Sequence, residues 1–281
     1  MSSHDELIEL AEAGDVAAML QLASLSDLAD RAKWYLRAAQ SENATASERL
    51  ASVRPDLEAR AADGNADCQN VLGGVLLAWD ENPAGAAVWF RKAAEAANNE
   101  ARRSLGYLLI EGAGVEKDVR AAEELFRLGA SDGDAVAQYN LAVLLLDEFP
   151  QPADLNEVVP LLESAAGAGI EEAATRLGDE LEAVGDDGGA LRWYEVAADS
   201  GHIDAMFAVG SRYRDGVGVD SDNVQAVKWF LRMLELPSFD GIHEILALAP
   251  SMADEEIRLG GRLAGRDAEA EKIIEMRSSA S

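Results

Sequence analysis

A helical motif repeats along this chain, and the repetition constrains the fold more than any other feature of the sequence. Its clearest copy occupies residues 105–126 (LGYLLIEGAGVEKDVRAAEELF), and a second occupies 209–230 (VGSRYRDGVGVDSDNVQAVKWF). In each copy an apolar run with helical spacing ends at a glycine-rich turn, and a second helical run follows it. Each copy therefore predicts a hairpin of two α-helices, and repeated hairpins are expected to stack on one another.

A Leu-Gly pair or a close variant marks the first helix of every copy. With this pair as an anchor there are six copies, at 22–23, 72–73, 105–106, 141–142, 177–178 and 209–210. The anchors after the first are 33, 36, 36 and 32 residues apart, and a small residue, Ala or Cys, lies four positions before each one. The second helix of each copy carries a bulky pair, at 34–35, 89–90, 125–126, 161–162, 193–194 and 229–230. A small residue at a close helix crossing, beside a large one that fills the next gap, allows stacked hairpins to bury a continuous core.

This pattern resembles that of the Sel1-like repeat family, a relative of the tetratricopeptide repeats. The residues that carry the resemblance are the small residue before the Leu-Gly pair, the G-x-G-V turns at 112–115 and 216–219, Lys117-Asp118, and the W-[YF]-x-x-A-A elements that begin at Trp34, Trp89 and Trp193. The resemblance covers roughly residues 14–236, and the fourth and fifth copies depart from it because they lack the G-x-G-V turn.

The resemblance implies an all-α fold, an α-solenoid of stacked helical hairpins with capping helices at both ends. We expect about six hairpins over 1–237, with a degenerate insertion near 41–64, because the second bulky pair follows the first by 55 residues. Capping helices are expected over 238–281 as part of the same structural unit. Neighbouring repeats share their core, so no internal domain boundary is predicted.

Three segments outside the regular copies need separate predictions. Pro55 is expected to divide the insertion into helices near 44–53 and 56–63, because a helix rarely runs smoothly through the residue before a proline. At the C-terminus the repeat spacing is lost, and we expect a helix over 239–249 and a final helix from about 254 to 277. Residues 1–13 are predicted to form a short helix that covers the first repeat.

Composition excludes several kinds of function. With 52 acidic and 24 basic residues the formal net charge is -28, which argues against binding to nucleic acids and to anionic membranes, since both need clustered Lys and Arg. No apolar run is long enough for a membrane span or a signal peptide, so a cytoplasmic location is expected. Cys68, the single cysteine, occupies a position that is alanine in the other copies and is interpreted as a small buried residue.

The acidic residues are concentrated in the middle of the chain. Between Arg127 and Arg192 there are fourteen acids and one base, Arg176, and hence a net charge of -13. These acids could simply solvate an exposed helical surface or reflect a host with an acidic proteome, or they could form a docking face for a cationic partner.

Motifs for catalysis, cofactors and metals are weak in this sequence. Residues 129–133 match G-x-S-x-G, but a hydrolase elbow needs a strand before the serine, and here a helix is predicted. The three histidines, His4, His202 and His243, are not paired at metal-ligand spacing. Asp220-Ser221-Asp222-Asn223 lacks the glycine and the closing glutamate of a calcium loop and is interpreted as a helix cap. We therefore predict no enzyme activity, cofactor or metal.

The favoured function is a non-catalytic scaffold or adaptor that binds a protein or peptide in the concave groove of the solenoid, as the resemblance implies. An alternative is an acidic decoy or immunity-type protein that neutralises a basic partner. A further alternative is an enzyme or small-molecule carrier with a site assembled from several repeats.

The resemblance also locates the expected groove, because the first helix of a tetratricopeptide-like hairpin lines the concave face. The exposed positions there lie two before and two after the anchor leucine, with others one turn further on. They are Asn70, Arg103, Tyr107, Tyr139, Thr175, Asp179, Glu182, Phe207, Ser211 and Arg214. The aromatic members favour an apolar anchor on the partner, and the two acids favour a Lys or Arg beside it. The alternative is that these rings pack against adjacent helices.

Overall fold

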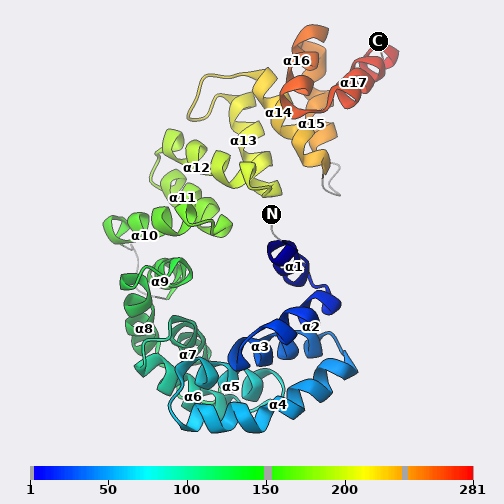
Figure 1. Ribbon diagram of the computed structural model, residues 1–281. Coiled ribbons are helices and arrows are strands. Elements are labelled where there is room, and N and C mark those ends of the chain that lie inside the picture. The colour runs from blue at the N-terminus through cyan, green and yellow to red at the C-terminus, as the bar shows by residue number, and fades with distance from the viewer. Residues whose placement is uncertain (1–2, 149–153, 236–239, 281) are drawn as a thin grey trace. The chain divides into compact units, whose positions relative to one another are not determined.

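The computed structural model describes residues 3–148, 154–235 and 240–280, and within these ranges every regular element is helical (Figure 1). The all-α fold of stacked hairpins is therefore confirmed. The α-helices are α1 (Ser3–Glu12), α2 (Val16–Leu25), α3 (Leu28–Gln40), α4 (Ala44–Ala62), α5 (Ala66–Ala78), α6 (Pro83–Glu95), α7 (Asn99–Glu111), α8 (Val119–Ser131), α9 (Ala135–Asp147), α10 (Leu155–Gly167), α11 (Glu171–Ala183), α12 (Asp187–Asp199), α13 (Ile203–Asp215), α14 (Asn223–Arg232), α15 (Asp240–Leu248), α16 (Asp254–Ala264) and α17 (Asp267–Ala280). Short 3-10 helices cover Met233–Glu235 and Ala249–Ser251.

Residue contacts group the chain into two compact units, Met1–Gln151 and Pro152–Ser281. Unit 1 holds α1 to α9 and unit 2 holds α10 to α17, so the boundary falls inside a predicted hairpin. The prediction that the chain forms one structural unit stays a prediction.

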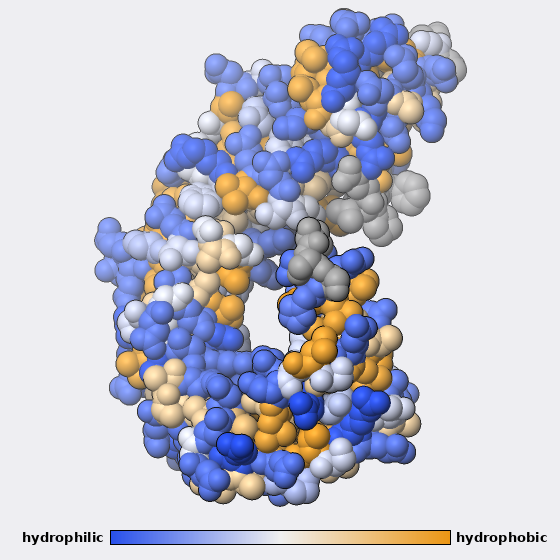
Figure 2. All heavy atoms as spheres, viewed as in Figure 1, coloured by the Kyte–Doolittle hydropathy of each residue, from blue (hydrophilic) through white to orange (hydrophobic). Residues whose placement is uncertain are grey.

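In unit 1 the helices stack in two layers. Successive helices pack against each other, with α5, α7 and α9 in the inner layer of the curved stack and α4, α6 and α8 in the outer layer (Figure 1). The visible surface is mainly hydrophilic with scattered apolar patches (Figure 2). None of the helices in the described ranges is both long and apolar enough to cross a bilayer.

The predicted crossing of a small residue with a large one is confirmed at the anchors. A Cβ atom placed on Gly73, Gly106, Gly178 or Gly210 would lie within 2.6 Å of the ring of Phe90, Phe126, Tyr194 or Phe230, respectively. These four rings are almost fully buried. Each ring therefore fills the space that the missing glycine side chain leaves, and the two helices of a hairpin approach closely for that reason.

The side chains that cap the first turn of the helices also recur at one position of the repeat. The side chains of Asn65, Asn98 and Asp134 each accept a hydrogen bond of 2.8 Å from the backbone N–H three residues on, at the small residue of the motif. His202 occupies the same position in α13, and its Nδ1 accepts from the N–H of Ala205 at 3.3 Å. These caps satisfy a backbone donor that the first turn of a helix leaves unpaired. In α11 the equivalent residue, Ile170, provides no such bond.

The insertion differs from the prediction, because it forms one helix, α4, with Pro55 inside it. Proline removes a donor, so the carbonyl of Ala51 lacks its helical partner. The buried side chains of Leu50 and Leu57 lie on both sides of the proline and pack into one apolar cluster with α3 and α5. Burial of two leucines, worth about 1.5–3 kcal/mol each, is enough to hold the helix through the proline.

The C-terminal region caps the last hairpin but is divided differently from the prediction. Helices α15, α16 and α17 share one apolar core with α12, α13 and α14, which confirms their capping role. The predicted final helix is interrupted at Gly265, whose positive φ of 69° ends α16. As expected, Gly260 permits a close approach, since a Cβ there would lie 2.7 Å from Val227 of α14. Phe239, the predicted start of α15, lies outside the described residues.

The anchor glycine can be tested with two matched substitutions. In Gly106→Ala the new Cβ would meet the buried Phe126 ring at 2.4 Å, whereas in Gly74→Ala it would meet Leu36 at an ordinary 3.6 Å. Both changes favour the helix, but overpacking costs about 1–3 kcal/mol, so chemical denaturation should show Gly106→Ala losing stability and Gly74→Ala losing none. Equal stability of the two variants would contradict the crossing assignment.

Candidate partner-binding surface

The ten predicted partner-binding positions are divided between the two units. Unit 1 holds Asn70, Arg103, Tyr107 and Tyr139, and unit 2 holds the other six. In unit 1 only Tyr107 is well exposed, at 49%. Its hydroxyl donates to Asn140 Oδ1 at 2.8 Å, and its ring packs edge-on against Phe126. The ring is therefore both exposed and held in place.

The other positions of unit 1 are less accessible. Asn70 is buried, with 6% of its surface exposed. Arg103 forms an ion pair with Asp134 of the next hairpin, and Tyr139 is half-buried. These side chains contribute to packing between helices. The alternative interpretation of the groove positions expects such packing for their aromatic rings.

In unit 2 the two predicted acids already have internal partners. The hydroxyl of Tyr194 is shared between Asp179 Oδ1 at 2.6 Å and Glu182 Oε2 at 2.9 Å. Burial and these carboxylates raise the pKa of Tyr194 well above its usual range. Glu182 also receives an ion pair of 2.5 Å from Arg212, whose guanidinium is buried and lies 5.0 Å from the Tyr194 ring. Asp179 and Glu182 thus help to join α11, α12 and α13.

The exposed side of α13 has the properties of a binding surface. Phe207 is 38% exposed, and its ring lies 5.9 Å from the buried ring of Phe230. It borders two cavities, of about 820 Å³ and about 330 Å³. Ser211 is half-buried and lines the smaller cavity. Thr175, on α11, is half-buried, and its hydroxyl has no hydrogen-bond partner in the part of the chain that the structure describes.

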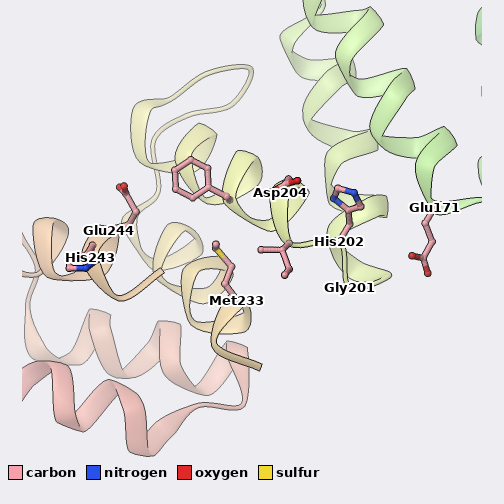
Figure 3. A pocket seen from close by; sticks show the side chains of 9 residues that line it. Glu171, Gly201, His202, Asp204, Met233, His243 and Glu244 are labelled. Carbon is pink, nitrogen blue, oxygen red and sulfur yellow. The ribbon is translucent and has the colours of Figure 1, made fainter. Parts of the chain in front are cut away.

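The larger cavity combines apolar and acidic groups from three helices. Figure 3 shows His202 and His243 on opposite sides of it, with Met233 between them. Three carboxylates, from Glu171, Asp204 and Glu244, also line it. Arg214 forms an ion pair with Glu244 and another with Asp215. Among the described residues, Glu171 and Asp204 have no ionic partner, so the cavity carries unneutralised negative charge. We name this region, with Phe207 at its centre, the α13 surface.

Sequence reasoning missed most of the α13 surface. It identified Phe207, Ser211 and Arg214 but dismissed His202 and His243 as isolated. His202 follows from the repeat, since it is the capping position of the fifth regular copy. His243 and Glu244 lie in α15, beyond the last copy, where no spacing predicts which side chains face the repeat.

The acidic middle of the chain is largely occupied by structural contacts. Asp132, Asp134, Glu148, Glu180, Glu182 and Asp187 form ion pairs. Asp154 and Asp186 cap α10 and α12. Within the described ranges, the exposed acids of this segment that have no ionic, capping or other hydrogen-bond partner are Glu163, Glu171 and Glu172. The available negative charge is therefore concentrated in α10 and at the start of α11.

The motifs set aside on sequence grounds have structural roles. Ser131 ends α8 and donates to the carbonyl of Leu128 at 2.8 Å, so a helix and not a strand precedes it. Asp222 caps α14 by accepting from Val224 and Gln225. Cys68 is buried, and burial raises the pKa of its thiol. In the described part of the chain, no three His, Cys, Asp or Glu side chains converge to hold a metal.

Comparison with known proteins identifies the family. The Sel1 repeat matches the chain at residues 74–98, 99–134, 135–169, 172–202 and 203–238, which is more than half of its length. The chain belongs to the Sel1 repeat family. Among curated proteins, none matches the sequence significantly.

Solved structures agree with this assignment. A protective antigen of uropathogenic Escherichia coli with an SLR fold is 25% identical and superposes with a TM-score of 0.62, covering 99% of this chain and 66% of the antigen. A Sel1 repeat protein from Oxalobacter formigenes is 20% identical, with a TM-score of 0.63 over 72% of this chain and 86% of that one. The chain thus spans just under two thirds of the antigen. An immunity protein from Pseudomonas aeruginosa gives a TM-score of 0.39, from which we draw no conclusion.

The structural role of Arg212 can be tested against a surface arginine. In Arg212→Met the buried guanidinium that joins Glu182 and Asp187 is lost, and a hydrogen bond to a charged group contributes about 1.5–3 kcal/mol. Urea denaturation should show a loss of that order. In Arg192→Met, which removes an exposed arginine of α12, the change should stay within about 0.5 kcal/mol. Equal effects would mean that the ion pairs of Arg212 with Glu182 and Asp187 do not stabilise the fold.

Proposed function

We propose that this protein is a non-catalytic scaffold, and that the α13 surface binds an extended segment of a protein partner. Sel1 repeat proteins generally mediate protein–protein interactions and are typically not enzymes. The segment in this proposal carries an apolar side chain next to a Lys or Arg. The observation that carries the proposal is an exposed aromatic ring, Phe207, between two cavities, the larger of which includes two carboxylates that form no ion pair among the described residues.

Phe207 is suited to be the apolar anchor of this surface. Its ring rests on Phe230, which is fully buried, so its position is fixed before any partner arrives. A pre-ordered side chain loses little conformational entropy on binding. Aromatic residues of this kind commonly dominate the energy of an interface, since partners can bury a large apolar area on them.

The carboxylates of the larger cavity define the charge of the partner. Glu171 and Asp204 are exposed and form no ion pair among the described residues, so a Lys or Arg can approach them without displacing an internal ion pair. Exposed ion pairs contribute only about 0.2–1 kcal/mol each. The acids therefore act mainly on specificity and on the association rate, while the apolar anchor supplies most of the affinity.

The same proposal extends to the length of the groove, the charge of the partner and the location of the protein. A continuous groove that also includes Tyr107 and the other predicted positions of unit 1 requires that the repeats form one structural unit. A basic partner surface and a cytoplasmic location agree with the charge and the single cysteine of the chain.

A second candidate function is that of an acidic decoy or immunity-type protein. It is favoured by the net charge of -28. In that case the binding energy would be spread over the acidic surface, and no single cavity would matter. The two candidates differ in where negative charge must be removed to weaken binding.

The role of the ring can be tested by Phe207→Ala, with Val196→Ala as a control. Both side chains are exposed, at 38% and 44%, but Val196 lies on α12 away from the two cavities. A photoreactive phenylalanine analogue placed at position 207 or 196 first identifies a partner that crosslinks only at 207. Calorimetry with that partner should then show Phe207→Ala losing about 1–3 kcal/mol of binding energy and Val196→Ala losing almost none. Equal losses would contradict the proposal.

The role of charge can be tested with two pairs of substitutions that remove the same charge. Glu171→Gln with Asp204→Asn neutralises the cavity, and Glu163→Gln with Glu172→Gln neutralises acids that do not line it. We expect only the first pair to slow association by several-fold and to reduce its salt dependence. If both pairs slow association equally in stopped-flow measurements, the acidic decoy is the better description.

A further inference from the structure

A third cavity, in unit 1, differs in chemistry from the α13 surface. It has a volume of about 280 Å³ and lies between α3, α5, α6 and α7. Lys33 and Arg37 of α3 line it, together with Asn70 of α5 and Glu100 of α7. In a chain with more than twice as many acids as bases, two cations beside one acid make this cavity locally positive.

Asn70 is the most unusual residue of this cavity. Only 6% of its surface is exposed, yet its side-chain amide has no hydrogen-bond partner among the described residues. The side-chain oxygen and nitrogen of Asn70 are not among the fully buried polar atoms, so they are reached from the cavity. The amide N–H groups are therefore available to a ligand that accepts a hydrogen bond inside the cavity.

The cavity exists because this copy of the repeat departs from the others. The position of Gly74 is occupied by Tyr107, Val143, Asp179 and Ser211 in the following copies. A side chain on Gly74 would point toward Leu36, which lies 3.6 Å from the position of its Cβ. The absence of this side chain leaves room beside Asn70. In Figure 2 an apolar patch with a hydrophilic border lies over the region of α3 and α5.

The two cations have donors to spare. Arg37 donates to the carbonyl of Glu12 at 3.0 Å and lies over the Trp34 ring at 5.7 Å, which leaves most of its N–H groups available. Lys33 Nζ binds both carboxylate oxygens of Glu100, at 2.8 and 2.9 Å. Both residues of that pair are about half exposed, so an arriving carboxylate can compete with Glu100 for the ammonium.

We propose that this cavity binds an acidic peptide segment of a partner protein, through an Asp or Glu side chain that is followed by an aliphatic residue. The Asn70 amide donates to the carboxylate, Lys33 and Arg37 balance its charge, and the aliphatic side chain packs on Leu36. Because the rest of the chain is acidic and repels acidic segments, only a segment that inserts its carboxylate here is accepted. This site goes beyond the proposed function, which concerns unit 2 and a segment of opposite charge.

The experiment uses the full chain and a phage-displayed library of random dodecapeptides. Peptides enriched on the wild type and depleted on Asn70→Leu are synthesised, and their affinities are measured by fluorescence anisotropy. We expect them to contain Asp or Glu beside Leu, Ile or Val, and to bind Asn70→Leu at least about tenfold more weakly, since a hydrogen bond to a charged group is lost. Thermal unfolding of Asn70→Leu should stay close to the wild-type temperature, because the Asn70 side chain makes no hydrogen bond within the described residues that the variant would remove.

Three further variants give the sign of the effect. Lys33→Met and Arg37→Met should each weaken the selected peptides several-fold, whereas Glu100→Gln should strengthen them, because it releases Lys33. Phe207→Ala should leave the affinity of these peptides unchanged, so the proposals for this site and for the α13 surface are tested independently.

Several results would overturn the proposal. These are no enrichment, enriched peptides without acids, equal affinity for Asn70→Leu, or no loss when the acid of the peptide is replaced by its amide. A dimer that forms at high concentration and is lost in Asn70→Leu would assign the cavity to a second copy of this chain instead.

Discussion

The close crossing between the two helices of each hairpin is the interaction on which the rest of the structure depends. A glycine on the first helix accepts the face of a ring from the second, and this contact fixes how near the two helices lie. Once that distance is fixed, the alanines around the crossing become buried without leaving cavities, as Ala93 and Ala101 illustrate. In the copy with anchor Ala142, the ring is replaced by Leu162, so the larger anchor is matched by a smaller partner. The volumes at the crossing are thus conserved while the residues change.

Several cations of the chain join neighbouring hairpins. Arg103 pairs with Asp134, Arg214 with Glu244 and Arg232 with Asp199, at sequence separations of 31, 30 and 33 residues. These separations are close to the length of one repeat, so each ion pair joins a helix to a neighbouring copy of the repeat or to the C-terminal cap. These ion pairs also neutralise acids locally, which lowers the electrostatic self-repulsion of a strongly acidic chain. Between Arg127 and Arg192, only a few exposed acids of the described residues lack such a contact, and their positions are informative.

The sequence was sufficient to predict the parts of the structure that repeat. Anchors, bulky pairs and most helix starts recur at one period, so chance agreement is improbable. Pro55 was misinterpreted because the local rule for proline says nothing about the burial of Leu50 and Leu57, which holds the helix together. The break at Gly265 was missed because a single glycine can either weaken a helix or end it, and only the positive φ distinguishes the two.

The candidate sites were predicted less well, for a physical reason. Asp179 and Glu182 have the exposed register of groove residues, but Tyr194 and Arg212 reach them from two other helices. Whether an acid on such a surface is available depends on these partners, which are 12 to 30 residues away in the sequence. A helical period gives the face on which a side chain lies and not what lies opposite it.

Departures from the repeat mark both candidate sites. Positions that obey the pattern are committed to the core or to caps, so they cannot also recognise a partner. The α13 surface arises where a phenylalanine takes a position that is Leu, Asn, Arg, Tyr or Thr in the other copies, and where the chain leaves the repeat and places α15 beside it. The cavity around Asn70 arises where Gly74 replaces a larger residue. A stack of similar hairpins thus gains distinct surfaces by changing single residues that lie outside the crossings, because the crossings alone hold the helices in place.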